Sequence, residues 1–327
     1  MNWSTTTVLV TGAGGFIGSH LVDRLVQLGA RTRALVHYNS ERRAGWLDRS
    51  ARLRDVELVF GDVRDADSIG AAFANTDVVF HLAALIGIPY SYVAPSAYLR
   101  TNAAGTMNVL NAALASGSRL VIHTSTSEVY GTARSTPIDE GHPLQAQSPY
   151  AASKIAADKL AESFHLSFGL PVVTLRPFNT FGPRQSGRAV IPTVISQALD
   201  GAELRLGNLE PRRDLNYVLD TVEAYVLAAG APSAVGTVLN IGSGRDVSVR
   251  ELATLVLRLM GVELPIVQDE NRVRPEHSEV LRLVADSGRA RDLLGWRSTW
   301  SLEDGLARTI DWMEEHRSTF EPNVYAI

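Results

Sequence analysis

The chain has no cysteine and no long apolar run, and each absence removes a class of function. Without cysteine there is no disulfide, no thiolate metal ligand and no cysteine nucleophile. No apolar run approaches the ~20 residues of a membrane span. The net charge of −4 gives no electrostatic footprint for nucleic acid. A strand signal follows the first residues almost at once and leaves no room for a signal peptide, so we expect a cytoplasmic protein without a membrane or nucleic-acid partner.

The 45% hydrophobic share of the 327 residues is ample for a core, and the apolar residues are grouped in an alternating pattern. Two long stretches, Ala103–Ser116 and Tyr150–Phe168, read as helices. Repeated strand–helix units predict an α/β fold with a Rossmann-like, doubly wound parallel sheet. The segments that read as its strands are Val8–Val10, Arg33–Val36, Val56–Phe60, Val78–Leu82, Leu120–His123, Val172–Leu175 and Val238–Ile241.

The regular alternation of strand and helix signals ends after Pro177. Asn179–Arg188 reads as a loop, and shorter helix and strand signals follow it. We therefore expect a smaller, mixed C-terminal lobe. The predicted first domain is 1–177 with a returning segment near 214–241, and the predicted second lobe is 178–213 with 242–327. The tail, Glu321–Ile327, is predicted to be irregular.

A glycine-rich turn lies between the first strand and the first helix. Gly12, Gly15 and Gly18 are spaced three apart. Glycine permits a tight turn and lets backbone approach a pyrophosphate, which the free N–H groups of a helix N-terminus then bind. The spacing differs from the G-x-G-x-x-G of dehydrogenases, and an ordinary turn is the alternative.

The end of the second strand bears on the choice of cofactor. NAD sites usually place an acid there to bind the ribose hydroxyl, but no acid occurs before Glu41, and Arg42 and Arg43 follow. This pattern leans toward NADP, unless the arginines are only solvated. Asp62 follows the third strand, where it is either a turn residue or the acceptor for the adenine amino group.

The segment Ser125–Gly131 carries the chemistry. It follows a buried strand, at the edge where open α/β sheets place their active sites. Downstream, Tyr150 and Lys154 are spaced i, i+4 and lie on one helix face. A neighbouring lysine favours the phenolate of a tyrosine, whose free pKa of ~10 is too high for a base. Alone, such a pair is more often plain helix surface.

These motifs together resemble the extended short-chain dehydrogenases/reductases. The match extends over essentially the whole chain. Within that family the chain resembles nucleotide-sugar 4,6-dehydratases, especially the legionaminate-pathway type acting on an NDP-N-acetylglucosamine. The segments that carry the resemblance are Thr11–Gly18, Gly61-Asp62, His81–Ala84, Asn102–Thr106, Ser125–Gly131, Tyr150–Lys154, Arg176–Asn179, and, for the narrower match, Ala84–Ser91 and Arg188–Pro192.

The resemblance implies a role for each catalytic residue. Tyr150 takes the proton of the sugar 4-hydroxyl, Thr126 binds the same hydroxyl, and Lys154 supports Tyr150 and the nicotinamide ribose. Glu128 then takes the C5 proton, water leaves across C5 and C6, and hydride returns to C6. The product is a 4-keto-6-deoxy sugar. A salt bridge at the strand end is the alternative role for Glu128.

Ser127 departs from the pattern of dTDP-glucose 4,6-dehydratases, which carry an aspartate here as the acid for the leaving water. Serine is a poor acid, so Glu128 or a relayed water would have to act. The same Thr-Ser-Glu also resembles UDP-glucuronate decarboxylases, and a decarboxylase or an NDP-sugar 4-epimerase is the leading rival. A dinucleotide-sensing regulator without turnover is a third alternative.

The remaining expectations also come from the resemblance. A homodimer should form through a four-helix bundle built from the two predicted helices. His81 and His123 read as core histidines, no metal site is expected, and Asn102 should brace or cap a helix. The predicted NAD(P) site comprises Gly12, Gly15, Phe16, Ile17, Gly18, His37, Arg42, Asp62, Val63, Leu82, Ala83, Ala84, Tyr150, Lys154 and Pro177. The predicted sugar-nucleotide site comprises Ile86, Ser91, Thr126, Asn179, Arg184, Val190, Arg213 and Arg274.

Overall fold

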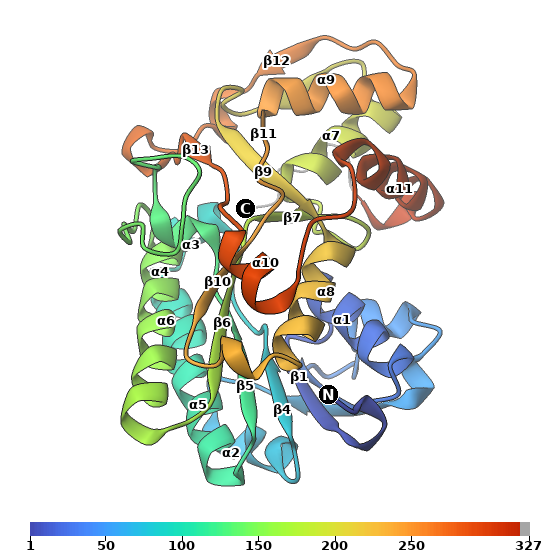
Figure 1. Ribbon diagram of the computed structural model, residues 1–327. Helices are drawn as coiled ribbons and strands as arrows, with labels where there is room; N and C mark the ends of the chain where they lie inside the picture. Colours follow the sequence, from blue (N-terminus) through green and yellow to red (C-terminus); the bar gives the residue numbers. More distant parts are fainter. Residues whose placement is uncertain (321–327) are drawn as a thin grey trace.

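The computed structural model describes residues 1–320, and its centre is a seven-stranded sheet in the order β10-β6-β5-β4-β1-β2-β3 (Figure 1). Every neighbouring pair in it is parallel. The strands are β1 (Thr7–Thr11), β2 (Arg31–His37), β3 (Val56–Gly61), β4 (Val78–His81), β5 (Leu120–Thr124), β6 (Val172–Pro177) and β10 (Val238–Ile241). These are the seven predicted strands within a few residues at each end, and the predicted fold is confirmed.

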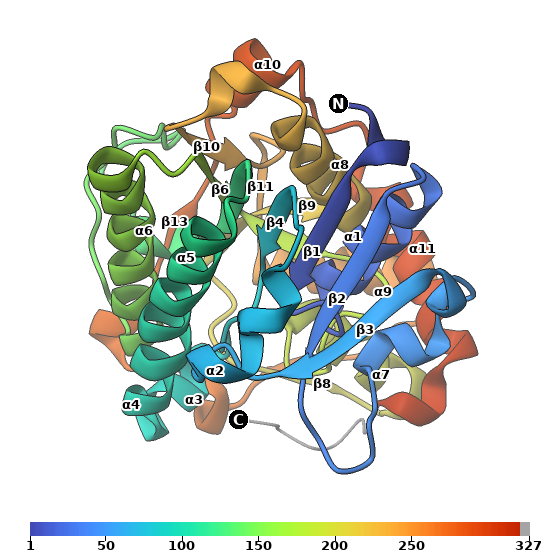
Figure 2. The same ribbon diagram turned by 90° about the horizontal axis from the view of Figure 1, so that it is seen from below.

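Both faces of the sheet are covered by helices (Figure 2). Val8 and Val10 on β1 pack in the same core as α1 (Phe16–Gln27) and α8 (Val218–Ala229). Leu9, between them, packs on the opposite side with α5 (Gly105–Ser116) and α6 (Pro149–Phe168). Because successive side chains of a strand point to opposite faces, burial on both sides requires the continuous apolar runs that the sequence shows.

A smaller, mixed sheet lies beyond the carboxyl ends of the main strands, at the top of Figure 1. Its central strand, β9 (Arg212–Tyr217), pairs antiparallel with β11 (Asp246–Ser248) and parallel with β13 (Arg282–Leu283) and β7 (Asn179–Phe181). A parallel pair joins β8 (Leu204–Leu206) to β12 (Ile266–Gln268). The helices of this part are α7 (Val190–Asp200), α9 (Val249–Met260) and α11 (Leu302–Glu315).

The chain returns from this part to the main sheet through β10, which is followed by β11 and, later, by α10 (Gly288–Leu294). This is the kind of return that the sequence predicts for the first lobe. The division of the chain at 177, 214 and 242 stays a prediction. The predicted irregular tail, Glu321–Ile327, lies outside the described residues.

Two segments differ from the sequence-based prediction. The expected loop Asn179–Arg188 begins with β7, because Asn179–Phe181 lies in register with Leu215–Tyr217 of β9. The expected helix from Ala103 begins instead as a π-helical turn, Leu99–Ala104, that continues α4 (Pro95–Tyr98) into α5. Single π-helical turns occur often at functional sites. The other short helices are α2 (Ala66–Ile69) and α3 (Ile88–Val93).

Two buried carboxylates hold segments that are distant in the sequence. Asp214 on β9 accepts hydrogen bonds from the backbone N–H groups of Ser243, Gly244 and Ala285. Asp220, in the first turn of α8, accepts from the Thr299 hydroxyl at 2.7 Å and the Trp300 N–H at 3.0 Å. They therefore fix the loops that approach the carboxyl edge of the sheet.

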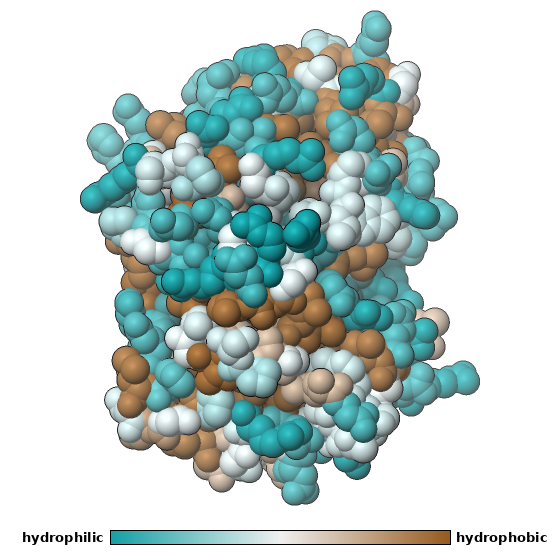
Figure 3. Space-filling model, viewed as in Figure 1, coloured by the Kyte–Doolittle hydropathy of each residue, from teal (hydrophilic) through white to brown (hydrophobic). Residues whose placement is uncertain are grey.

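The surface is mixed in character. Hydrophobic residues lie along its lower left edge in Figure 3, which is the edge formed by α6 in Figure 1. No helix within residues 1–320 has the length and apolar character of a membrane span.

Candidate active site

The glycine turn forms a backbone cradle at the N-terminus of α1. Gly12 has φ +70°, and a Cβ there would lie 2.7 Å from the Ala83 nitrogen. A Cβ on Gly18 would collide with the Gly12 carbonyl. Gly15 is the N-cap of α1 and provides no side-chain cap, so the N–H groups at Phe16 and Ile17 begin the helix without one. Such a helix N-terminus suits a pyrophosphate, and these residues fit a dinucleotide.

The neighbouring strand ends are tied to the same cradle. The Thr11 hydroxyl accepts hydrogen bonds from the N–H groups of Leu82 (3.2 Å) and Ala83 (3.1 Å). The segment Leu82–Ala84 therefore passes directly beside Gly12. Pro177 ends β6, at the same carboxyl edge, and is buried. All of these predicted cofactor residues lie along one edge of the sheet.

The ends of β2 and β3 carry charged groups for the adenosine side. His37 lies 3.3 Å from Asp62, and Arg64 binds the same carboxylate at 2.8 Å. The hydrogen bond from Arg64 is the main reason why the pKa of Asp62 lies below its ordinary value. The Arg42 guanidinium lies 5.2 Å from the centre of the Phe60 ring. Val63 is buried against Gly105 of α5. Asp62 is therefore held as an anion by the Arg64 guanidinium.

The predicted catalytic residues converge at the end of β5. Thr126 caps the 3₁₀ turn Ser127–Tyr130, and its hydroxyl accepts from the Glu128 N–H at 3.2 Å. Thr126 is also hydrogen-bonded to the Tyr150 side chain. Tyr150 and Lys154 lie in the first turns of α6, where Ser148 is the N-cap. Local capping thus brings the predicted Thr126, Tyr150 and Lys154 together, with Thr126 half-buried and the other two buried.

Burial dominates the titration of this group. It raises the pKa of Tyr150 above its ordinary range, with the hydrogen bond to Thr126 acting against it and the Glu128 carboxylate adding to it. Burial also lowers the pKa of Lys154 to about 8, with the Asp158 carboxylate opposing the change. The Lys154 ammonium donates to the Thr124 carbonyl at 2.6 Å. The chain alone therefore leaves Tyr150 protonated, and a base at this position requires further positive charge.

Glu128 links this group to the smaller sheet. Its carboxylate raises the pKa of Tyr150, and it also raises the pKa of Arg213 against the dominant lowering by burial. Ser127, between Thr126 and Glu128, is buried. The carboxylate that the resemblance implies as the C5 base therefore lies within electrostatic range of both Tyr150 and Arg213 of β9.

Two of the three predicted diphosphate arginines come together. Arg213 and Arg274 both reach Glu279 Oε1, at 3.3 and 3.5 Å. Arg184 instead forms an ion pair with Asp23 of α1 at 2.8 Å, and its φ is +68°. The structure thus groups Arg213 with Arg274 and places Arg184 apart from them.

The remaining predicted substrate residues flank this region on separate elements. Asn179 begins β7, and its Oδ1 is buried without a hydrogen-bond partner in the described part of the chain. Val190 begins α7. Ile86 is exposed, whereas Ser91 is buried and bonds the Ile88 carbonyl at 2.7 Å. Of these, the exposed Ile86 side chain and the Asn179 Oδ1 atom are available for contact with a substrate.

Asn102 acts as a brace and not as a helix cap. Its side chain donates to the Leu85 carbonyl and the Ser153 hydroxyl, both at 2.9 Å, and accepts from the Leu85 N–H at 2.8 Å. Ser153 in turn bonds the Tyr150 carbonyl at 2.7 Å. The π-helical turn therefore positions a side chain that ties the loop after β4 to the catalytic helix.

Sequence reasoning missed several side chains that the structure brings to this site. Tyr98 packs edge-on against Tyr150, with ring centres 6.2 Å apart, and bonds the Gly87 carbonyl. Glu279 holds the two arginines, and Asp158 lies behind Lys154. Only Asp158 had a signal, because it continues the Tyr150–Lys154 face at a further i+4 step.

The two core histidines are buried, as predicted. His81 bonds Thr11 at 2.8 Å and Thr106 at 2.9 Å, and burial holds its pKa well below the ordinary value. His123 bonds Asp158 at 3.1 Å. Within residues 1–320, no cluster of three or more histidine or acidic side chains has an arrangement suited to a metal ion.

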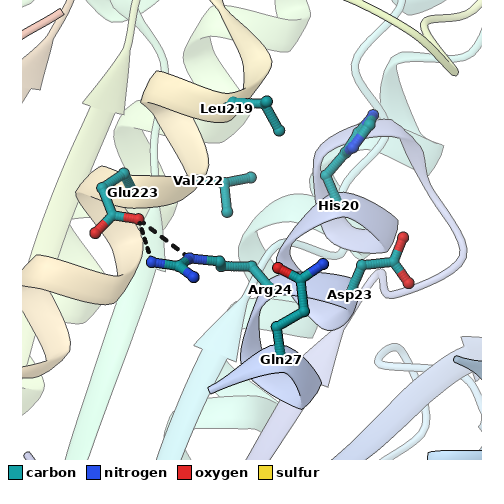
Figure 4. A pocket seen from close by; sticks show the side chains of 7 residues that line it. All are labelled: His20, Asp23, Arg24, Gln27, Leu219, Val222 and Glu223. Carbon is teal, nitrogen blue, oxygen red and sulfur yellow. Dashed lines mark hydrogen bonds and ion pairs between the residues drawn. The ribbon is translucent and has the colours of Figure 1, made fainter. Parts of the chain in front are cut away.

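A hollow between α1 and α8 lies away from this chemistry (Figure 4). Arg24 and Glu223 pair across it at 3.2 Å. His20, at its rim, bonds the Pro183 carbonyl at 2.9 Å, and burial with the Arg184 charge lowers its pKa to about 4. Its charged groups are mutually paired, and no predicted site residue lines it.

Comparisons with known proteins give a consistent result. The family model described as GDP-mannose 4,6 dehydratase matches residues 9–309. The dTDP-glucose 4,6-dehydratase of Streptomyces antibioticus is 35% identical over 322 residues, which cover 96% of this chain and 94% of that protein. The UDP-glucose 4-epimerase of Mycolicibacterium smegmatis is 36% identical over 310 residues, covering 93% and 97%. The crystal structure of DesIV, a dTDP-glucose 4,6-dehydratase of Streptomyces venezuelae with NAD bound, superposes with a TM-score of 0.85 at 32% identity, covering 97% and 99%.

We predict that Lys154→Met stabilises the fold at neutral pH. A pKa lowered from 10.5 to about 8 means that the charged lysine costs about 3 kcal/mol below pH 8. This cost disappears as the pH rises toward 10.5, because the folded lysine is by then neutral. The free energy of unfolding measured in urea should therefore be higher for the variant than for wild type by about 1–3 kcal/mol at pH 7. The difference should be smaller at pH 10.

The matched control is Lys159→Met, on the same helix but with a 60% exposed side chain. It should change the free energy of unfolding by less than about 0.5 kcal/mol at either pH. A Lys154→Met protein that is weaker than wild type at pH 7, with a gap that widens at pH 10, would contradict the prediction.

Proposed function

The chain belongs to the GDP-mannose 4,6-dehydratase family of nucleotide-sugar dehydratases and epimerases, and from that premise we propose that it is an NAD(P)-dependent NDP-sugar 4,6-dehydratase. The observation that carries the proposal is the position of Glu128. Its carboxylate acts electrostatically on both Tyr150 and Arg213, one turn from Thr126. A plain 4-epimerase needs the hydroxyl base, whereas loss of water needs this second, carbon-directed base as well.

The proposed mechanism assigns one proton to each side chain. Tyr150 takes the proton of the sugar 4-hydroxyl, which Thr126 also binds. A bound nicotinamide dinucleotide supplies the hydride acceptor and donor and ends as it began. Oxidation at C4 makes the C5 proton acidic, and Glu128 takes it. Since Ser127 is a poor acid, Glu128 then delivers that proton to the departing 6-hydroxyl. When hydride returns to C6, C5 takes up a proton from solvent and Tyr150 releases the proton that it took from the 4-hydroxyl, so the sugar loses one water overall.

The cofactor supplies what the chain lacks. Burial leaves the pKa of Tyr150 raised, and Lys154 is a buried basic side chain one helical turn away on α6. The positive charge of an oxidised nicotinamide would further favour the phenolate. At the adenosine end, His37 and Arg42 favour the 2′-phosphate of NADP, whereas the similar DesIV holds NAD.

The substrate is proposed to be an NDP-N-acetylglucosamine, with its diphosphate on Arg213 and Arg274. Arginine pairs suit this group because they bind phosphate oxygens with two charge-assisted hydrogen bonds. Asn179, whose buried Oδ1 has no partner within the described residues, would contact the same part of the ligand.

A second reaction, decarboxylation of a UDP-glucuronate or 4-epimerisation, is favoured by one observation. Ser127 stands where dTDP-glucose 4,6-dehydratases are expected to carry an aspartate, and the matched relatives include an epimerase of similar identity. Neither rival reaction needs an acid for leaving water.

A panel of UDP-, GDP-, dTDP- and CDP-hexoses, followed by mass spectrometry, tests the proposed reaction. We expect one substrate to lose a single water and to give a 4-keto-6-deoxy product. The dinucleotide released on denaturation identifies NAD or NADP. Loss of carbon dioxide, or an isomer of unchanged mass, would select the rival reactions.

Replacing Glu128 by glutamine separates the two chemical steps. The amide cannot accept the C5 proton, so water loss should fall by about 10²–10⁴-fold. Oxidation at C4 should persist, visible as reduced nicotinamide absorbance on adding substrate. Tyr150→Phe is the control that should suppress both signals. If Glu128→Gln lowers C4 oxidation as much as water loss, Glu128 is structural.

The homodimer is proposed to use α5 and α6, which pack against each other and expose several large apolar side chains. Met107 and Leu114 project from α5, and Leu166 and Phe168 from α6. Their spacing of seven places Met107 and Leu114 on one face of α5.

We predict that Leu166→Glu combined with Met107→Glu yields a monomer by light scattering, because four-helix packing would bury these charges. Leu219→Glu, an exposed leucine on α8, is the matched control and should stay dimeric. A wild-type protein that is monomeric at micromolar concentration would refute the dimer.

A further inference from the structure

A carboxylate is buried directly behind the catalytic pair. Asp158 lies one helical turn beyond Lys154 on α6 and is 5% exposed. Its Oδ2 accepts hydrogen bonds from the Ser125 hydroxyl at 2.7 Å and from Arg176 Nε and Nη2 at 3.1 and 3.0 Å. Its Oδ1 lies 3.1 Å from His123 Nε2. One side chain therefore joins α6 to both β5 and β6.

These bonds fix the backbone that carries the site. Ser125 directly precedes Thr126, and the Thr124 carbonyl accepts a hydrogen bond from the Lys154 ammonium. The Tyr225 hydroxyl of α8 bonds Thr124 Oγ1 at 2.9 Å from the other face of the sheet. The end of β5 is thus held from two sides, so that Thr126 is presented to Tyr150.

The charges around Lys154 do not balance without Asp158. His123 donates through Nε2 while its Nδ1 has no partner in the described part of the chain, and burial lowers its pKa, so it is neutral. His81, on β4, is likewise buried with a lowered pKa. Arg176, on β6, is a buried cation. Two cations, Arg176 and Lys154, therefore share one anion.

We propose that Asp158 is the positioning residue of this site: its carboxylate anchors the end of β5 to α6 and is the buried counter-charge that keeps Lys154 protonated beside Tyr150. The inference deepens the proposed function, since it gives Tyr150 and Lys154 the roles assigned above. The Asp158 charge on its own raises the pKa of Tyr150, and Arg176 offsets that charge through its ion pair with Asp158. The remaining positive charge resides on Lys154, one helical turn from Tyr150. This is the arrangement that a phenolate base requires.

The chain offers an unusually direct test, because its only lysines are Lys154 and Lys159. With isotope-labelled lysine, the full-length protein gives two side-chain NMR signals, and the exposed Lys159 serves as an internal reference. In wild type, Lys154 should titrate near 8. In Asp158→Asn it should titrate about one pH unit lower, since an opposite charge has been removed, while Lys159 stays unchanged.

The matched control is Asp220→Asn, another buried carboxylate that holds a distant loop. It should leave the Lys154 titration unchanged even if it destabilises the fold. Asp158→Asn leaves Arg176 buried without a counter-charge and so risks unfolding. The double variant Asp158→Asn/Arg176→Gln removes both charges of that pair and should still show the lowered Lys154 titration.

A second readout is the pH profile of turnover. A lysine that loses its proton earlier supports Tyr150 only at lower pH, so the alkaline limb of kcat should move down by about the same pH interval, with little change in KM. A folded Asp158→Asn protein whose Lys154 titrates as in wild type would overturn the inference. Because the NMR titration needs no substrate, failure of the sugar panel alone would refute only the proposed reaction.

Discussion

The burial of Lys154 and Asp158 on one face of α6 is the constraint around which the site is built. Neither charge is stable alone in such a position, since an unpaired buried ion shifts its pKa and neutralises. Asp158 meets this condition with Arg176, Ser125 and His123, while the Lys154 ammonium uses the Thr124 carbonyl. The same contacts that satisfy the charges fix the end of β5. The hydrogen bonds that compensate the two buried charges are thus the same ones that set the geometry of the site.

The smaller sheet adds a second set of charges to this edge. Arg213 and Arg274 meet on a single oxygen of Glu279, at distances near the upper limit for a hydrogen bond. A diphosphate offers several oxygens to the same guanidinium groups, so it can bind both arginines more fully than one carboxylate oxygen does. The Glu128 carboxylate also acts electrostatically on Arg213, which couples the proposed diphosphate site to the proposed carbon base.

The main sheet could be predicted because its strands are buried on both faces and so stand out as apolar runs. The close backbone approach at Gly12 and Gly18 was likewise predictable from their glycine identity, since backbone atoms lie where a Cβ would be. Three features could not be predicted from the residues near them in the sequence. They are the π-helical turn at Leu99–Ala104, the pairing of Asn179–Phe181 with β9, and the contact of Glu279 with two arginines. Each depends on a partner distant in the sequence, and Arg184 became paired with Asp23 for the same reason.

Loss of water, unlike inversion at C4, requires a group that removes the C5 proton and a group that protonates the leaving 6-hydroxyl. In this site one side chain would have to do both in succession. Ser127 is buried and has no titration in the working range, so it cannot be that group. Glu128 is partly exposed, lies on a short turn fixed by Thr126, and acts electrostatically on Arg213. In the proposed mechanism this carboxylate would serve both C5 and the 6-hydroxyl, which are on adjacent carbons. A single carboxylate acting first as base and then as acid would make an aspartate in place of Ser127 dispensable for dehydration.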